Sequence, residues 1–204
     1  MPQLKVCGIT DAAFALEAAR RGIDYLGFIF AAGSPRRVDA ARAREIAHNV
    51  RHETGVDAPR FVGVFVEQDV PEILQIAKAV PLDVVQLHGA YGSEKVAAIK
   101  AQGCEVWRLA GDEKDCAGED ATLLDGRDGA RSGGTGRLAD WSRIADLKRA
   151  GRRVVLAGGI SAANAAAAAT SGADIVDVNS SLETAPGVKS TALLDAFLAE
   201  LPPR

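Results

Sequence analysis

Eight short apolar runs alternate with longer, alanine-rich segments along the whole chain of 204 residues. Most of the runs are nearly continuous in hydrophobic residues, which is typical of parallel strands that helices cover on both faces. The predicted strands are residues 4–6, 25–30, 61–66, 84–87, 105–109, 122–124, 154–157 and 175–178. Because each strand is followed by a segment of helical character, the sequence predicts an α/β fold built from repeated βα units.

The ends of the predicted helices carry recurring signals. Segments 22–25, 103–106, 151–154 and 172–175 each begin with a glycine that precedes a strand, which predicts a left-handed residue after a helix end. The alanine run 162–169 predicts one helix packed closely on the strands. The predicted helix starts are Thr10, Asp69 with Pro71 and Glu72 behind it, Ser93, Asp140 and Ser161.

Eight βα units could form either a closed barrel or an open, doubly wound sheet. The first strand is not followed by Gly-x-Gly-x-x-Gly, which disfavours a dinucleotide-binding sheet. Glycine-rich or polar loops follow the second, sixth, seventh and eighth strands instead of clustering at one switch point. The sequence therefore predicts a (β/α)8 TIM barrel in which residues 1–204 form a single domain.

Composition excludes several classes of protein. The formal net charge of −3 gives no basic face for nucleic acid, and no apolar window is long enough to cross a membrane. Cys7, Cys104 and Cys116 form no CxxC pair, so neither a disulfide framework nor a four-ligand zinc site is predicted. A cytoplasmic protein that binds no nucleic acid or membrane is expected.

Chemically reactive side chains stand at the ends of the predicted strands. Cys7 follows the first strand, where a thiol can transfer protons, although free cysteine is also a common buried apolar residue. Asp125 ends the sixth strand, where an aspartate can be a general acid, a helix cap or a loop brace. Arg36 follows the second strand; it can bind a carboxylate or phosphate, or form a solvated basic pair with Arg37.

The loops after the last two strands predict a phosphate site. Gly158 and Gly159 follow the seventh strand, and Ser180 and Ser181 follow the eighth. Glycine lets backbone amides approach an oxyanion, and helix N-termini add favourable dipoles. In a barrel, the loops after the seventh and eighth strands together hold a phosphate group. A phosphorylated small-molecule substrate is therefore expected.

Several motifs resemble one family from end to end. They are Lys-Val-Cys-Gly-Ile-Thr at 5–10, Gly-Phe-Ile-Phe at 27–30 with Ser34 and Arg36, Val-Gln-Leu-His-Gly at 85–89, Leu-Leu-Asp at 123–125, Gly-Gly-Thr-Gly at 133–136, Asp-Trp at 140–141, Gly-Gly-Ile at 158–160 and Pro-Gly-Val-Lys at 186–189. In this combination and order the chain resembles the phosphoribosylanthranilate isomerases of tryptophan biosynthesis. The resemblance implies a (β/α)8 barrel that performs the Amadori rearrangement of N-(5-phosphoribosyl)anthranilate to 1-(2-carboxyphenylamino)-1-deoxyribulose 5-phosphate, with no metal or organic cofactor.

The resemblance also implies a role for individual residues. Cys7 acts as the base in its thiolate form, Asp125 as the acid, and Arg36 as the partner of the anthranilate carboxylate. His88 has the alternative of binding a loop carbonyl, and Asp177 either contacts a sugar hydroxyl or organises the rim. The substrate-binding residues implied by the resemblance are Arg36, Gln86, His88, Gly134, Gly158, Gly159, Asp177, Ser180 and Ser181.

Departures from the family pattern and two other functions stay open. Asn179 and Ser181 stand where the family commonly has serine and glycine, and Ser181 brings strain if its position needs a positive φ.

The related isomerase of histidine biosynthesis, one alternative function, uses a pair of aspartates. The thiol of Cys7 argues against this alternative. A non-catalytic phosphosugar-binding barrel is the other alternative. Either a monomer or a homodimer is compatible with the sequence.

Overall fold

Eight parallel strands form a closed barrel in the computed structural model, which describes residues 1–110, 118–126 and 139–203. The strands are β1 (Gln3–Cys7), β2 (Tyr25–Ile29), β3 (Arg60–Val66), β4 (Val84–His88), β5 (Glu105–Leu109), β6 (Ala121–Leu124), β7 (Val154–Leu156) and β8 (Ile175–Val178). Each strand pairs with its neighbours in chain order, and β1 closes the barrel by pairing with β8. The predicted barrel and its eight strands are thus confirmed, whereas the single-domain extent stays a prediction.

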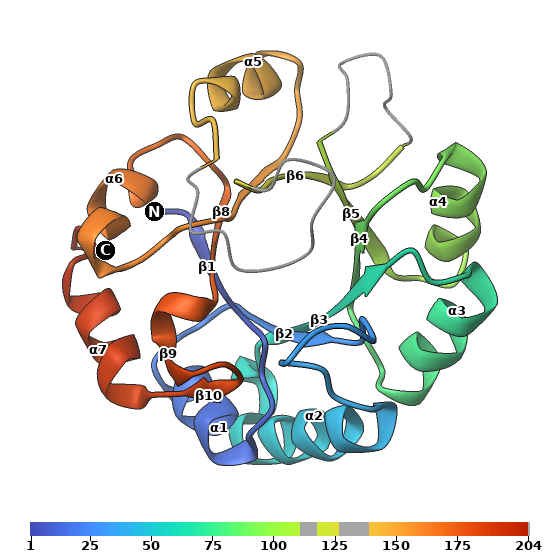
Figure 1. The fold of residues 1–204 in the computed structure, drawn as a ribbon, viewed down its shortest axis with the longest axis horizontal. Helices are drawn as coiled ribbons and strands as arrows, with labels where there is room; N and C mark the ends of the chain where they lie inside the picture. Colours follow the sequence, from blue (N-terminus) through green and yellow to red (C-terminus); the bar gives the residue numbers. More distant parts are fainter. Residues whose placement is uncertain (111–117, 127–138, 204) are drawn as a thin grey trace.

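The helices form a ring outside the barrel (Figure 1). They are α1 (Ala12–Arg20), α2 (Ala40–Thr54), α3 (Val70–Ala79), α4 (Ser93–Lys100), α5 (Arg143–Arg149), α6 (Ala165–Ala169) and α7 (Thr191–Ala199), with short 3-10 turns η1 (Gly55–Asp57), η2 (Ala162–Asn164) and η3 (Ser180–Leu182). Gly22, Gly103, Gly151 and Gly172 all have positive φ, as predicted for the joints between helix and strand. The alanine run is helical throughout, but its first turn is a 3-10 turn instead of α-helix.

Two of the predicted helix starts are confirmed. The Asp69 carboxylate accepts a hydrogen bond from the Glu72 N–H, and Ser161 forms a capping box with Asn164.

Three of the predicted starts are shifted. Asp11 caps α1, because the Thr10 hydroxyl instead donates to the Gly187 carbonyl at 2.8 Å. Ser93 is already the first residue of α4 and follows the cap residue Gly92. Asp140 accepts hydrogen bonds from Ser142, one turn before α5 begins.

An aspartate precedes each even-numbered strand and joins it to the strand before. In every case Oδ2 accepts a hydrogen bond from a main-chain N–H of the preceding odd-numbered strand. The pairs are Asp24 with Leu4 (2.7 Å), Asp83 with Phe61 (2.7 Å), Asp120 with Val106 (2.8 Å) and Asp174 with Val154 (2.7 Å). These four hydrogen bonds hold neighbouring strands in register at the amino-terminal edge of the barrel.

The barrel interior changes character along its axis. Toward the amino-terminal end of the strands it is filled by a buried apolar cluster that includes Tyr25, Val62, Val84, Trp107, Val155 and Ile175. Nearer the carboxyl end, the buried interior positions include Lys5, Gln86 and Asp177. Because an apolar interior would suffice for packing, these polar residues point to a function at the carboxyl end of the barrel.

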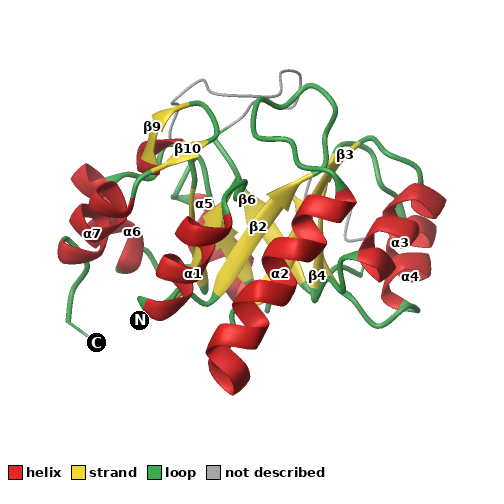
Figure 2. Ribbon diagram, turned by 90° about the horizontal axis from the view of Figure 1, so that it is seen from below, coloured by secondary structure: helices red, strands yellow, loops and turns green. Residues whose placement is uncertain are grey.

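A hairpin that the sequence does not predict lies over the carboxyl ends of the strands (Figure 2). It consists of β9 (Glu183–Ala185) and β10 (Val188–Lys189), which pair in antiparallel fashion. The hydrogen bond from Thr10 to the Gly187 carbonyl ties the hairpin to the loop after β1. The hairpin therefore brings two further charged side chains, Glu183 and Lys189, to the mouth of the barrel.

Candidate active site

Cys7 and Asp125 lie at the same end of the barrel. Cys7 is the last residue of β1, and Asp125 directly follows β6, so both stand at the carboxyl ends of parallel strands. The Cys7 side chain is buried, and Asp125 is partly exposed. In characterised barrels of this type the chemistry takes place at this end.

The Cys7 thiol sits in a buried, charged environment. Burial raises its pKa, whereas the ammonium groups of Lys5 and Lys189 oppose this rise and the Asp177 carboxylate adds to it. Lys5 is fully buried and donates from Nζ to Asp177 Oδ2 at 2.6 Å. Burial alone would lower the pKa of Lys5, but Asp177 and Cys7 outweigh it, so the pKa is raised and Lys5 carries a positive charge.

Glu183 joins two cations beside Cys7. Its carboxylate accepts hydrogen bonds from Arg36 at Nε (2.8 Å) and Nη2 (2.7 Å), and from Lys189 Nζ at 2.6 Å. Burial would raise the pKa of Glu183, but these two donors lower it below the usual value. Lys189 also donates to the carbonyl and side-chain oxygens of Asn179, at 3.0 and 2.8 Å. Asn179, a departure from the family pattern, thus supplies an acceptor for Lys189.

The position of Arg36 rules out one of the two interpretations of its role. The side chain is only 13 % exposed, so it does not form a solvated surface pair with Arg37. A Cβ added at Gly8 would lie 2.9 Å from Arg36 Cδ, which places Arg36 beside the residue that follows Cys7. Among the described residues, Nη1 of Arg36 donates no hydrogen bond, whereas Nε and Nη2 both bind Glu183.

Gly158 makes room for the Asp125 carboxylate. Its φ is +84°, and an added Cβ would lie 2.7 Å from Asp125 Oδ1. Any other residue here would therefore be strained and would collide with the predicted acid. Gly159 has a φ of +69°, and the amides of both glycines donate no hydrogen bond to a described residue. Both N–H groups are therefore available to an anion.

Ser181 substitutes for the family glycine without backbone strain. It lies in η3, and it is not among the described residues with positive φ. Its hydroxyl donates to the Ile160 carbonyl at 2.6 Å, which joins the loops after β7 and β8. The backbone strain considered for Ser181 does not occur.

Ser180 is the first residue of η3, so its N–H has no acceptor within that turn.

Gln86 and His88 contact one another at the end of β4. Gln86 Nε2 and His88 Nε2 are 2.9 Å apart, and Gln86 is buried. Gln86 Oε1 is buried with no hydrogen-bond partner among the described residues, so it can accept a hydrogen bond from a ligand.

Gly134 falls outside the described residues. Its predicted role, like the substrate contacts predicted for the other residues, stays a prediction.

Three charged residues of this site were assigned no role from the sequence. Lys5 interrupts the first apolar run, and a lysine inside a predicted buried strand is a usable signal. Glu183 and Lys189 reach the site only through the β9–β10 hairpin, and their spacing along the chain does not predict that contact.

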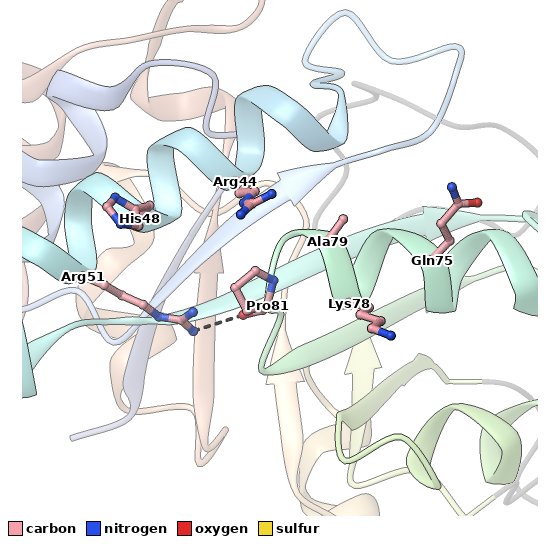
Figure 3. Close-up of a pocket in the computed structure, with 7 residues that line it drawn as sticks. All are labelled: Arg44, His48, Arg51, Gln75, Lys78, Ala79 and Pro81. Atoms are coloured by element: carbon pink, nitrogen blue, oxygen red, sulfur yellow. Dashed lines mark hydrogen bonds between the residues drawn. The ribbon is translucent and has the colours of Figure 1, made fainter.

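A separate hollow of about 580 Å³ lies outside the barrel between α2 and α3 (Figure 3). Its lining residues are Arg44, His48, Arg51, Gln75, Lys78, Ala79 and Pro81. Arg51 spans part of it by donating to the Pro81 carbonyl at 3.1 Å. The hollow includes none of the predicted site residues, so it is distinct from the mouth of the barrel.

No helix in ranges 1–110, 118–126 and 139–203 is long and apolar enough to cross a membrane. Within the same ranges no group of three or more histidine, cysteine, aspartate or glutamate side chains is placed to hold a metal ion. The absence of a cofactor stays a prediction.

The barrel and the charged, thiol-bearing mouth define an enzyme of the (β/α)8-barrel class. Residues 4–200 match the family model of N-(5'-phosphoribosyl)anthranilate isomerase. The chain belongs to this family of aldose–ketose isomerases of tryptophan biosynthesis, as the motifs predicted.

Individual relatives agree with this assignment. The N-(5'-phosphoribosyl)anthranilate isomerase of Rubrobacter xylanophilus is 39% identical over 208 residues, which cover 98% of each chain. The crystal structure of the Thermus thermophilus enzyme is 34% identical, covers 97% of both chains and superposes with a TM-score of 0.82. A family structure in complex with reduced 1-(o-carboxyphenylamino)-1-deoxyribulose 5-phosphate is 30% identical over 98% of both chains, with a TM-score of 0.80.

Proposed function

We propose that this protein converts N-(5-phosphoribosyl)anthranilate to 1-(2-carboxyphenylamino)-1-deoxyribulose 5-phosphate, with Cys7 as general base and Asp125 as general acid. The observation that carries the proposal is the family match over residues 4–200, together with a thiol and a carboxyl group at one end of the barrel.

The reaction needs one acid and one base. Protonation of the furanose oxygen by Asp125 opens the ribose ring and leaves an iminium ion at C1. The iminium acidifies the neighbouring C2–H, and the Cys7 thiolate removes that proton. The electrons of the broken C–H bond move into the iminium and give an enolamine. Transfer of the hydroxyl proton away from the C2 oxygen and protonation of C1 then yield the ketose. Because the substrate's own iminium accepts the electrons, no metal or organic cofactor is required.

The two anionic ends of the substrate fix its orientation in this proposal. Arg36 binds the anthranilate carboxylate, and amides around Gly158, Gly159, Ser180 and Ser181 bind the phosphate. Binding at both ends holds the sugar between Cys7 and Asp125, and such positioning contributes several kcal/mol to catalysis. The paired state of Arg36 supports this assignment, since Glu183 holds the guanidinium in place while Nη1 stays available.

The mouth of the barrel supports the tryptophan-pathway substrate over that of histidine biosynthesis. The histidine-pathway isomerase performs the same chemistry with two aspartates, and here one of those positions is the thiol of Cys7. We further propose a cytoplasmic location and a monomeric or homodimeric state.

The test is an assay with purified protein and both substrates. Phosphoribosylanthranilate is fluorescent, so its conversion is followed as loss of fluorescence, with and without a metal chelator. We expect turnover of this substrate, unaffected by the chelator, and little or none of the histidine-pathway substrate. Binding without turnover would instead support the non-catalytic phosphosugar-binding barrel, and preferential turnover of the histidine-pathway substrate would overturn the assignment.

A further inference from the structure

We propose that Lys5 is a positioning residue for the isomerisation: its buried ammonium group, anchored by Asp177, faces the Cys7 thiol and stabilises the thiolate that removes the substrate proton. This inference rests on the proposed role of Cys7 as the base. It deepens that role by assigning the group whose charge allows Cys7 to ionise in a buried site.

The barrel brings the two side chains together. Lys5 and Cys7 are two residues apart on β1, so both point into the barrel. Gly27 pairs with Cys7 across β1 and β2, and it leaves the space that both side chains occupy. A Cβ added at Gly27 would lie 3.0 Å from Cys7 Sγ and 3.2 Å from Lys5 Cε. The thiol and the end of the lysine chain therefore converge on one point.

Asp177 fixes the ammonium group from the other side. Lys5 pairs with Asp177 across β1 and β8, and Nζ lies 2.6 Å from Oδ2. The Lys5 side chain is 0% exposed and that of Asp177 is 6% exposed. A buried ion pair is seldom more stable than a well-packed apolar pair of similar volume. Packing alone therefore does not explain why Lys5 and Asp177 are charged and buried here. A role in the ionisation of Cys7 does explain it.

Four charged groups act on the thiol. Lys5 comes from β1 and Asp177 from β8, while Lys189 reaches it from β10 and Arg36 from the loop after β2. Lys5 is the strongest of the groups that favour the thiolate, and it opposes both burial and Asp177. Without Lys5, only the weaker contributions of Lys189 and Arg36 would oppose burial and the Asp177 carboxylate, which both disfavour ionisation of Cys7.

Lys5 takes no part in the proton balance of the reaction. Cys7 first loses its proton to solvent, and the resulting thiolate takes the proton from C2 of the substrate and returns to the thiol. The ammonium group keeps its protons throughout and acts only through its charge and hydrogen bond. An effect of Lys5 on catalysis must therefore appear as a change in the ionisation of Cys7.

The test measures the rate of Cys7 alkylation by iodoacetamide as a function of pH, in the parent and in Lys5→Met. Mass spectrometry of the peptide that contains Cys7 separates this reaction from those of Cys104 and Cys116. Because the thiolate is the reactive form, the pH midpoint reports the ionisation of Cys7. We expect the midpoint to rise by about one pH unit or more in Lys5→Met, and kcat/KM at neutral pH to fall about tenfold per unit.

Lys148→Met is the matched control. Lys148 Nζ, on α5, also lies 2.6 Å from an aspartate oxygen, that of Asp174, but both side chains of this pair are partly exposed. We expect neither the midpoint nor kcat/KM to change. Lys5→Arg keeps the charge and should restore most of the reactivity of Cys7. If Lys5→Met does not fold, Lys5→Met with Asp177→Asn is compared with Asp177→Asn alone, because the Asp177 carboxylate itself disfavours the thiolate.

Two outcomes are distinguishable. The role of Lys5 would be overturned by an alkylation midpoint of Lys5→Met within about 0.3 pH unit of the parent, or by one of the double variant within the same range of Asp177→Asn. Full activity of Cys7→Ala would instead overturn the proposed base, whatever the alkylation experiment shows. The two failures have separate readouts because alkylation does not require turnover.

Discussion

The two ends of the barrel use charged residues in opposite ways. At the amino-terminal end, Glu105 accepts hydrogen bonds from Arg60 (2.7 Å), Trp107 (3.3 Å) and Arg153 (3.1 Å). Arg153 also donates to the Tyr25 hydroxyl at 2.8 Å. The polar groups of this network bind one another and close the bottom of the barrel.

At the carboxyl end the charges gather around a reactive group. Three cations, Lys5, Arg36 and Lys189, face two carboxylates and the Cys7 thiol. These groups hold one another in place, yet an apolar interior of similar volume would be at least as stable, so the buried charges point to a role in the chemistry. The comparison teaches that one end of the barrel secures the fold and the other positions charge for an anionic substrate.

The largest expected effect is that of Cys7→Ala. We expect kcat/KM to fall toward the upper end of about 10²- to 10⁴-fold, because the variant has no base at the sugar C2. Loss of phosphoribosylanthranilate fluorescence gives the rate, and the cooperativity of unfolding shows whether the barrel is intact. A rate near that of the parent would remove Cys7 from the mechanism.

Asp125→Asn should reduce kcat/KM by about 10²- to 10³-fold, since an amide cannot supply the proton for ring opening. The effect is smaller than that of Cys7→Ala because glycosylamine rings also open unaided in water. The same assay measures it. Activity within a few-fold of the parent would mean that another group provides the proton.

Arg36→Ala should weaken binding of the anthranilate carboxylate by about 1.5–3 kcal/mol, which raises KM about 10- to 150-fold. Arg37→Ala is the matched control, because Arg37 is the next residue and is exposed. If both variants show the parent's KM and kcat, Arg36 serves only to hold Glu183.

Asp120→Ala tests the opposite end. It removes the acceptor of the Val106 N–H and the partner of Lys100, 2.7 Å away. We expect the free energy of unfolding to fall by about 1–3 kcal/mol with kcat/KM unchanged. Denaturant titration measures the change, and Asp195→Ala, at an exposed ion pair with Arg21, should show little. A loss of activity without a loss of stability would contradict the division between the two ends.

The smallest expected effect is on stability at alkaline pH. The folded state raises the pKa of Cys7, so it favours the protonated thiol, and this contribution is present below the unfolded thiol pKa of about 8.5. It is lost as pH rises toward the higher folded pKa. The raised pKa of Lys5 acts in the same direction at higher pH. Denaturation midpoints should therefore decline less steeply above this pH in Cys7→Ala than in the parent, and equal slopes would show that the thiol does not contribute.

The fold could be predicted almost completely, because its signals are local. Continuous apolar runs and the glycines before strands depend on neighbouring residues alone, and the structure confirms both. The aspartate before each even-numbered strand was also visible in the sequence, although its partner lies on another strand and only the structure identifies it.

The site could be predicted in part. Cys7 and Asp125 follow strands, so their common location at the carboxyl end follows from parallel topology. The Arg36–Glu183–Lys189 contacts could not be found this way, since residues 147 positions apart meet only through the β9–β10 hairpin. Lys5 could have been singled out as a lysine inside an apolar strand, but its contact with Asp177 joins two strands 172 positions apart and only the structure identifies it.

The most direct test of this account combines Cys7→Ala with Asp120→Ala and measures kcat/KM and the free energy of unfolding for both single variants and the double variant. We predict that the double variant has the activity of Cys7→Ala, and that its loss of stability equals the sum of the two single losses within about 0.5 kcal/mol. A larger coupling, or a loss of activity in Asp120→Ala alone, would contradict the separation of catalysis and stability between the two ends of the barrel.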